Sequence, residues 1–142
     1  MRSNGPILIT GGRVIDPSQG IDRVASILIE NGRIAGFDAP TDGREDLEVI
    51  DATGKVVAPG LIDMHVHFRE PGVEDDETIL TGTAAAVAGG FTSVACVADT
   101  DPPLDTEGAV EFVQHQAARA NNCNVFVIAC VSKGRQGKEL AE

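Results

Sequence analysis

The second half of the sequence alternates between two kinds of apolar pattern, and this alternation constrains the fold more than any other feature. Nearly continuous apolar runs at residues 61–68, 91–97 and 124–130 are typical of strands. Between them, apolar residues recur at helical spacing in residues 77–89 and 106–120. Strands that are apolar throughout, each followed by a helix, predict a parallel sheet covered on both faces. The fold class is therefore α/β.

Local signals predict where these helices begin and end. Gly89 and Gly90 are expected to stop the first helix, Thr106 to cap the second, and residues 136–142 to begin a third. The pattern alone leaves two architectures open, a doubly wound open sheet and a (β/α)8 barrel, because polar groups at the C-terminal end of a strand suit both. No G-x-G-x-x-G sequence follows a strand, which removes the usual argument for a dinucleotide.

The first half of the chain has a different character. Short apolar runs are broken by turn residues, and the first of them, residues 7–10, is expected to end at Gly11-Gly12. Asn31-Gly32 separates two further apolar runs and predicts a β-hairpin. We expect an all-β module over residues 1–58 and a separate α/β domain over residues 59–142.

The most informative polar motif, Asp63-Met64-His65-Val66-His67-Phe68-Arg69, closes an apolar run at residues 56–62 that predicts a buried strand. Alternate side chains of a strand share a face, so Asp63, His65, His67 and Arg69 are expected to point the same way. Neutral imidazole is a good ligand for zinc and similar divalent metals, and two rings at i, i+2 can reach one ion. A half-exposed polar strand face is the alternative, but this residue combination favours a metal site.

Charge and cysteine content narrow the class of protein. The net charge of −11, from 22 acidic and 11 basic residues, argues against nucleic acid and anionic membranes as partners. No apolar run is long enough to span a bilayer, and the N-terminus lacks the apolar core of a signal peptide. Cys96, Cys123 and Cys130 are odd in number and show no C-x-x-C spacing, so a reducing cytoplasm is the expected location.

The segment around the two histidines resembles a known family. Residues 59–72, Pro-Gly-Leu-Ile-Asp-Met-His-Val-His-Phe-Arg-Glu-Pro-Gly, are similar to the metal-binding signature of dihydroorotases in the amidohydrolase superfamily. The resemblance covers nearly the whole chain and continues through Glu77-Thr78, Thr81-Gly82, residues 88–92 and residues 133–140. It implies the first three βα units of a TIM-type (β/α)8 barrel, preceded by part of a small β-sandwich.

The resemblance also implies roles for individual residues. His65 and His67 would bind the more buried metal of a site with one or two zinc ions, with Asp63 supporting them from beneath. Arg69 would bind the carboxylate of dihydroorotate bidentately; hydantoinases and allantoinases share the H-x-H motif but have less use for this arginine. The implied reaction is the reversible hydrolysis of the cyclic amide of (S)-dihydroorotate to N-carbamoyl-L-aspartate, a step of pyrimidine biosynthesis.

One position departs from the family pattern. After the second strand the family commonly has Pro-Asn-Thr, where the Asn amide helps hold the substrate, but this chain has Ala98-Asp99-Thr100. Asp99 is therefore a substrate-binding candidate by position, although an ionised Asp cannot donate a hydrogen bond and would repel a carboxylate. It is open whether Asp99 is a different ligand, a protonated donor or a sign of altered function.

The length of the chain bears on activity. A (β/α)8 barrel takes about 250 residues, and residues 59–142 hold three of its eight strands, so a fragment or a truncated gene product is expected. The family's other metal-binding His residues and its catalytic Asp belong to later strands, so no catalytic residue is assigned here and the chain alone is expected to be inactive.

Two alternatives to a dihydroorotase stay open. One is a non-catalytic dihydroorotase-like scaffold for aspartate carbamoyltransferase, and the other is a cyclic amidohydrolase of the hydantoinase or allantoinase type. The expected partners are the small-molecule substrate and, among proteins, further copies of the chain or aspartate carbamoyltransferase.

Overall fold

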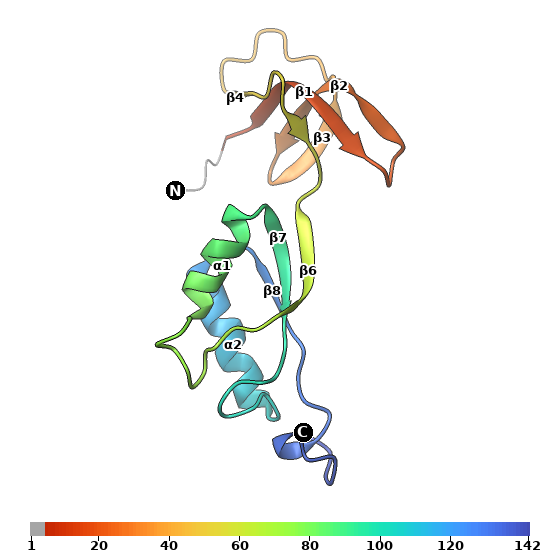
Figure 1. Cartoon of the computed structure of the whole chain (residues 1–142). Helices are drawn as coiled ribbons and strands as arrows, with labels where there is room; N and C mark the ends of the chain where they lie inside the picture. The colour runs from red at the N-terminus through yellow and green to blue at the C-terminus, as the bar shows by residue number, and fades with distance from the viewer. Residues whose placement is uncertain (1–4) are drawn as a thin grey trace. The chain divides into compact units, whose positions relative to one another are not determined.

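The computed structural model describes residues 5–142, and the chain divides into two compact units, one ending at Pro59 and the other beginning at Gly60. Each unit has its own sheet (Figure 1). Each also has its own cluster of buried apolar side chains. Over residues 5–142, no helix has the length and apolar character that crossing a membrane requires.

The first unit is built from strands. Its five-stranded sheet has the order β3-β2-β1-β4, with β5 also paired to β1; the strands are β1 (Ile7–Asp16), β2 (Ile21–Glu30), β3 (Arg33–Phe37), β4 (Glu48–Asp51) and β5 (Val56–Val57). The pairs β1–β2 and β2–β3 are antiparallel, whereas β4 and β5 run parallel to β1. Asn31 and Gly32 have φ values of 52° and 72°, as a tight hairpin turn requires, so the hairpin prediction is confirmed.

The first strand is longer than the sequence predicts. It was expected to end at Gly11-Gly12, but β1 continues to Asp16 through an irregularity between Ile9 and Gly12. Gly11 has a φ of 73°, and a Cβ there would overlap the Thr53 hydroxyl. Glycine therefore permits a β-bulge at this point instead of ending the strand.

The second unit has three parallel strands and two helices. The sheet order is β6-β7-β8, with β6 (Leu61–Val66), β7 (Phe91–Cys96), β8 (Asn124–Val127), α1 (Ile79–Ala88) and α2 (Glu107–Ala120). Gly89 is the C-cap of α1, and the Thr106 side chain accepts a hydrogen bond from the backbone N–H of Ala109 at the start of α2. Both predicted helix boundaries are confirmed.

The predicted third helix is wrong. Residues 136–142 are not helical; a single 3₁₀ turn at Lys133–Arg135 is followed by an isolated bridge between Ser132 and Leu140. Gly137, within this segment, has a positive φ of 69°, which a right-handed helix cannot accommodate. The second unit therefore holds two complete strand-helix pairs and a third strand.

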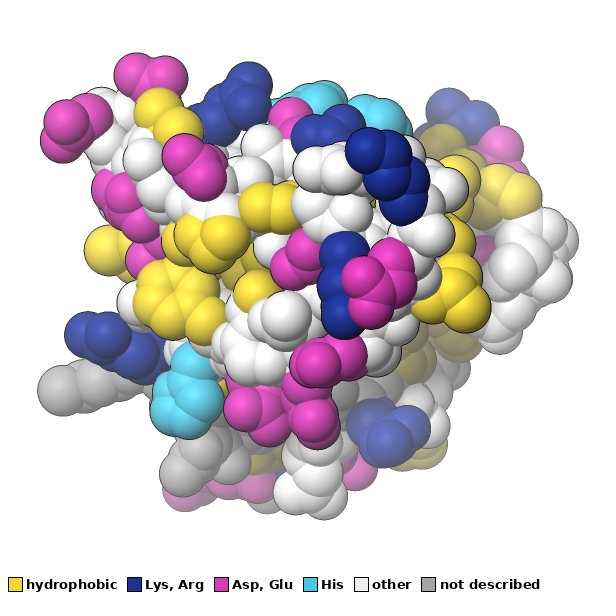
Figure 2. Space-filling view, turned by 90° about the horizontal axis from the view of Figure 1, so that it is seen from below, with side chains coloured by type: hydrophobic (Ala, Val, Ile, Leu, Met, Phe, Trp, Pro, Cys, Tyr) yellow, Lys and Arg dark blue, Asp and Glu magenta, His cyan; other side chains and the backbone are white. Residues whose placement is uncertain are grey.

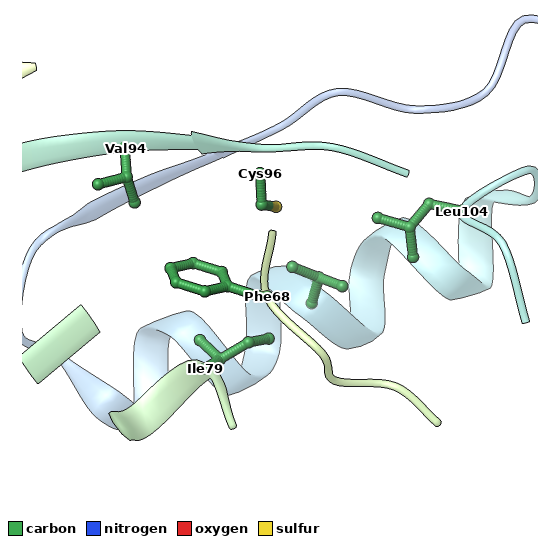
Figure 3. Close-up of a cluster of buried hydrophobic side chains, with 6 residues drawn as sticks. Phe68, Ile79, Val94, Cys96 and Leu104 are labelled. Carbon is green, nitrogen blue, oxygen red and sulfur yellow. The ribbon is translucent and has the colours of Figure 1, made fainter. Parts of the chain in front are cut away.

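The core of the second unit lies between the sheet and both helices. Figure 3 shows Phe68 and Ile79 facing Val94 and Cys96 of β7, and Leu104 and Val113 complete the buried cluster. These six side chains are at most 4% exposed, so the face of the sheet toward the helices is the packed one.

The opposite face of this sheet is exposed, contrary to the expectation that both faces would be covered. Ile62, Met64 and Phe126 are 66%, 77% and 61% exposed. The prediction of one buried strand over residues 56–62 is also wrong, because β5 ends at Val57 and β6 begins at Leu61. Within residues 5–142 β6 pairs with β7 alone, so it is an edge strand with no neighbour to cover its apolar side chains.

Candidate metal and substrate site

The candidate site lies where β6 and β7 end. Val66 pairs with Cys96, and the backbone N–H of Val97 donates to the carbonyl oxygen of Val66 at 3.0 Å. Because the two strands are parallel, the segments that follow them leave the sheet at the same edge. In the space-filling view, histidine, acidic and basic side chains gather at one rim of the visible face (Figure 2).

Phe68 anchors the segment that follows β6. Its side chain is 4% exposed and packs in the core between the sheet and the helices. The neighbouring side chains of His67 and Arg69 are 45% and 43% exposed. Burial of one apolar side chain thus holds two polar neighbours at the surface beside the end of β7.

The two imidazoles converge. His65 Nε2 lies 3.2 Å from His67 Nε2, and the ring centroids are 5.0 Å apart at an interplanar angle of 56°. Two nitrogen ligands of one tetrahedral zinc ion, at zinc–nitrogen distances of about 2.0–2.1 Å, lie about 3.3 Å apart. The arrangement of these two nitrogens therefore fits one divalent ion.

Two imidazoles are fewer ligands than a protein zinc site usually has. Among residues 5–142, no group of three or more His, Cys, Asp or Glu side chains is arranged to hold a metal ion. Protein zinc sites take three or four protein ligands. The described residues thus supply two candidate ligands, which would need further ligands to hold a metal tightly.

Asp63 does not follow the simple alternation that the sequence predicts. Asp63 lines a pocket of about 250 Å³ beside α1 together with Val66, His67 and Phe68, so residues that strict alternation places on opposite faces border one pocket. The pairing of β6 with β7 is irregular between Asp63 and Val66, which shifts the alternation. The Asp63 carboxylate accepts a hydrogen bond from the backbone N–H of His65 at 3.0 Å.

Asp99, at the end of β7, contacts both neighbouring polar residues. Its Oδ2 lies 2.7 Å from His67 Nδ1 and accepts from Arg69 Nη1 at 3.5 Å. Burial raises the pKa of Asp99, but the hydrogen bond with His67 and the charges of His67 and Arg69 outweigh burial, so its net pKa lies below the usual value. These contacts favour an ionised Asp99 over a protonated donor.

A close approach of two loops fixes Asp99 beside His67. Gly72 has a φ of 108°, and a Cβ at this position would overlap the carbonyl oxygen of Asp101. The backbone N–H of Asp101 donates to the carbonyl oxygen of Pro71 at 3.1 Å. Only glycine at position 72 allows the loops after β6 and β7 to meet this closely.

The structure thus brings His65, His67, Arg69 and Asp99 together and places Asp63 next to them through the backbone of His65. The contact between His67 and Asp99 was missed from the sequence, where these residues are 32 positions apart. The available signal was the parallel order of consecutive strands, which brings their C-terminal ends to one edge.

Comparison with known proteins agrees with this geometry. A family model described as dihydro-orotase-like matches residues 54–142. The chain is 48% identical over 136 residues to a dihydroorotase of Trichlorobacter lovleyi, covering 96% of this chain and 32% of that protein. It is 52% identical over 136 residues to a dihydroorotase of Solibacter usitatus, covering 96% of this chain and 31% of that protein.

Solved structures show the same superfamily. The L-hydantoinase (dihydropyrimidinase) of Arthrobacter aurescens superposes with a TM-score of 0.78 at 27% identity, covering 90% of this chain and 28% of that one. The D-hydantoinase of a Thermus species gives a TM-score of 0.67 at 32% identity, covering 89% and 28%. The chain spans about a third of the length of the curated relatives it matches. By its match to the family model over most of its length, the chain belongs to the dihydro-orotase-like family.

Proposed function

We propose that this chain provides one part of a dihydroorotase active site: a pair of metal ligands and the arginine that binds the substrate carboxylate. The observation that carries the proposal is the 3.2 Å approach of the His65 and His67 Nε2 atoms, with Arg69 two residues further on. The proposed reaction is the reversible, metal-dependent hydrolysis of the cyclic amide of (S)-dihydroorotate to N-carbamoyl-L-aspartate.

The architecture proposed for this function is a TIM-type barrel. The parallel β6-β7-β8 sheet, with α1 and α2 on one face, has the arrangement of the first strands of such a barrel, whose active site lies at the C-terminal ends of the strands. The sheet of residues 5–58 would form part of a β-sandwich. Its pocket of about 200 Å³ is lined mainly by apolar side chains, including Ile27 and Phe37.

In the proposed site, His65 and His67 hold zinc through their Nε2 atoms, and Asp63 supports them by fixing the backbone of His65. When bound, one or two zinc ions would polarise the substrate carbonyl and lower the pKa of a water molecule. Arg69 gives one N–H to Asp99, at 3.5 Å, and its planar guanidinium carries further donors for the substrate carboxylate.

The chain matches only about a third of its curated relatives, and this limits the activity expected of it alone. Because it supplies two metal ligands and spans about a third of its curated relatives, we propose that catalysis needs groups that those relatives carry in their other two thirds. Residues 1–142 by themselves are expected to be inactive.

A cyclic amidohydrolase of the hydantoinase type is the second candidate, because the structural matches include hydantoinases. The two candidates differ in the charge of the substrate. Dihydroorotate carries a carboxylate, whereas hydantoin and dihydrouracil do not, so a guanidinium beside the metal ligands favours dihydroorotate.

The test uses a chimaera in which residues 1–142 replace the matching third of the Trichlorobacter lovleyi dihydroorotase. We expect the zinc-loaded chimaera to hydrolyse dihydroorotate with a kcat/KM well above that for dihydrouracil. A preference for dihydrouracil or hydantoin would favour the second candidate. A folded, zinc-loaded chimaera without activity on any of these rings would contradict both.

A further inference from the structure

We propose that Asp99 is a positioning residue that sets the tautomer and orientation of His67, rather than a contact to the substrate. The inference rests on the proposed function in one respect only, since it takes Nε2 of His67 as the metal-binding atom. The family commonly places an Asn amide at this position, so the proposal gives this chain's Asp a different task.

The hydrogen-bond geometry assigns a direction to the proton. Asp99 Oδ2 lies 2.7 Å from His67 Nδ1, and an ionised carboxylate only accepts. Whenever the His67 ring is neutral, Nδ1 must then carry its one hydrogen, and Nε2 keeps a lone pair. That same Nε2 atom lies 3.2 Å from His65 Nε2, in the geometry of a shared metal. Carboxylate–histidine–metal chains of this kind raise the basicity of the ligand and fix its ring.

The position of the carboxylate argues against direct ligation by Asp99. Its Oδ2 contacts Nδ1, which faces away from the side of the ring on which Nε2 meets His65. A metal bound between the two Nε2 atoms is therefore out of reach of that oxygen. The two imidazoles are therefore placed to bind the metal, whereas Asp99 is placed to hold the ring of His67.

Asp99 is also badly placed to bind a carboxylate substrate. Its Oδ2 is already shared between His67 and Arg69, and its side chain is 21% exposed. A second carboxylate brought next to it would be repelled. By accepting from both residues, Asp99 instead couples the orientation of the metal ligand to that of the guanidinium.

The experiment reads the tautomer directly, without metal or substrate. In the zinc-free chimaera labelled with ¹⁵N-histidine, long-range ¹H–¹⁵N correlation spectra at about pH 8.5, where imidazole is ordinarily neutral, should show His67 protonated on Nδ1. Asp99→Ala should move that proton toward Nε2, the form that free imidazole side chains favour in water. Asp99→Asn keeps a side-chain oxygen acceptor and should restore part of the Nδ1 protonation. His115, which lies in α2, should not change in either variant.

A second measurement follows the metal itself. Titration of the zinc-free chimaera with Co²⁺, monitored by its absorption bands, should show about 10–100-fold weaker binding for Asp99→Ala, the usual effect of removing the partner of a ligating imidazole. The affinity of Asp99→Asn should lie between those of Asp99→Ala and the unmodified chimaera.

Two results would overturn the proposal. One is a His67 ring protonated on Nε2 in the unmodified chimaera, and the other is a tautomer and Co²⁺ affinity that Asp99→Ala leaves unchanged. Because the tautomer is measured without substrate, a chimaera inactive on dihydroorotate would count against the proposed function and not against this role of Asp99.

Discussion

Gly82 of α1 lies against the ring of Phe68, so that a Cβ on Gly82 would lie 2.6 Å from Phe68 Cε1. Phe68 is the anchor of the segment that carries His67 and Arg69, so the absence of a side chain at position 82 sets where the candidate site lies. Gly82→Ala should displace the ring, and overpacking of this kind costs about 1–3 kcal/mol. Glycine-to-alanine replacement in a helix otherwise stabilises by up to about 1 kcal/mol.

Gly108 in α2 provides the matched control, because nothing lies within 4 Å of a Cβ built there. In the chimaera, Gly82→Ala is expected to lower Tm and zinc content, whereas Gly108→Ala should leave zinc content unchanged and keep or raise Tm. Thermal unfolding and metal analysis of both variants check this. Equal Tm values for the two would show that Phe68 adjusts without cost.

Arg69 is predicted to bind the substrate carboxylate. In the chimaera, Arg69→Ala should lower kcat/KM for dihydroorotate at least about tenfold, since the loss of about 1.4 kcal/mol corresponds to that factor. Arg69→Lys keeps the charge but loses the planar fork and should restore only part of the rate. Zinc content should not change.

The substrate comparison separates recognition from stability. Activity of the chimaera on dihydrouracil should fall much less than activity on dihydroorotate when Arg69 is replaced by Ala. Equal losses on both rings would mean that Arg69 holds the site together instead of recognising charge.

The sequence predicts local features of this fold well and long-range ones poorly. The cap at Thr106 and the stop at Gly89 follow from neighbouring residues, so both boundaries were predictable. The exposure of Ile62 was not, because burial of an edge strand depends on which strand lies beside it. The helix predicted over residues 136–142 is absent because Gly137 has a positive φ, which the spacing of apolar residues does not predict.

In the candidate site, too, local features were predictable from the sequence and long-range contacts were not. The convergence of His65 and His67 follows from their i, i+2 spacing, and the structure places their Nε2 atoms 3.2 Å apart. The approach of Asp99 to His67 depends on the order of strands in the sheet and on the close contact at Gly72, which no local pattern contains.

The exposed sheet face is predicted to make residues 1–142 associate when expressed alone. Ile62 and Met64 of β6 and Phe126 of β8 are more than half exposed, and apolar strand edges promote aggregation. Despite the net charge of −11, we expect poor solubility or molten behaviour. Met64→Lys should raise the monomer fraction in size-exclusion chromatography with light scattering. A sharp, cooperative melt of an unmodified monomer would refute this.

The three thiols are predicted to differ in reactivity. Burial raises the pKa of all three thiols, but Cys96 is only 2% exposed, so its sulfur is out of reach of a reagent in solution. Cys123 and Cys130 are half-buried. Alkylation followed by peptide mapping should modify both at least about tenfold faster than Cys96, and denaturant should remove the difference. Rapid modification of Cys96 in the folded chimaera would mean that this core opens readily.

The central claim, that His65 and His67 bind one metal ion together, is tested most directly by the zinc content of the chimaera. Replacing both residues by Ala should remove zinc from their shared site and abolish activity together, because the two Nε2 atoms supply both of this chain's proposed ligands. His115→Ala, at a position in α2, should keep zinc and activity. Mass-spectrometric metal analysis decides the point: zinc lost with the His65/His67 pair supports the account, and zinc content equal to that of the unmodified chimaera contradicts it.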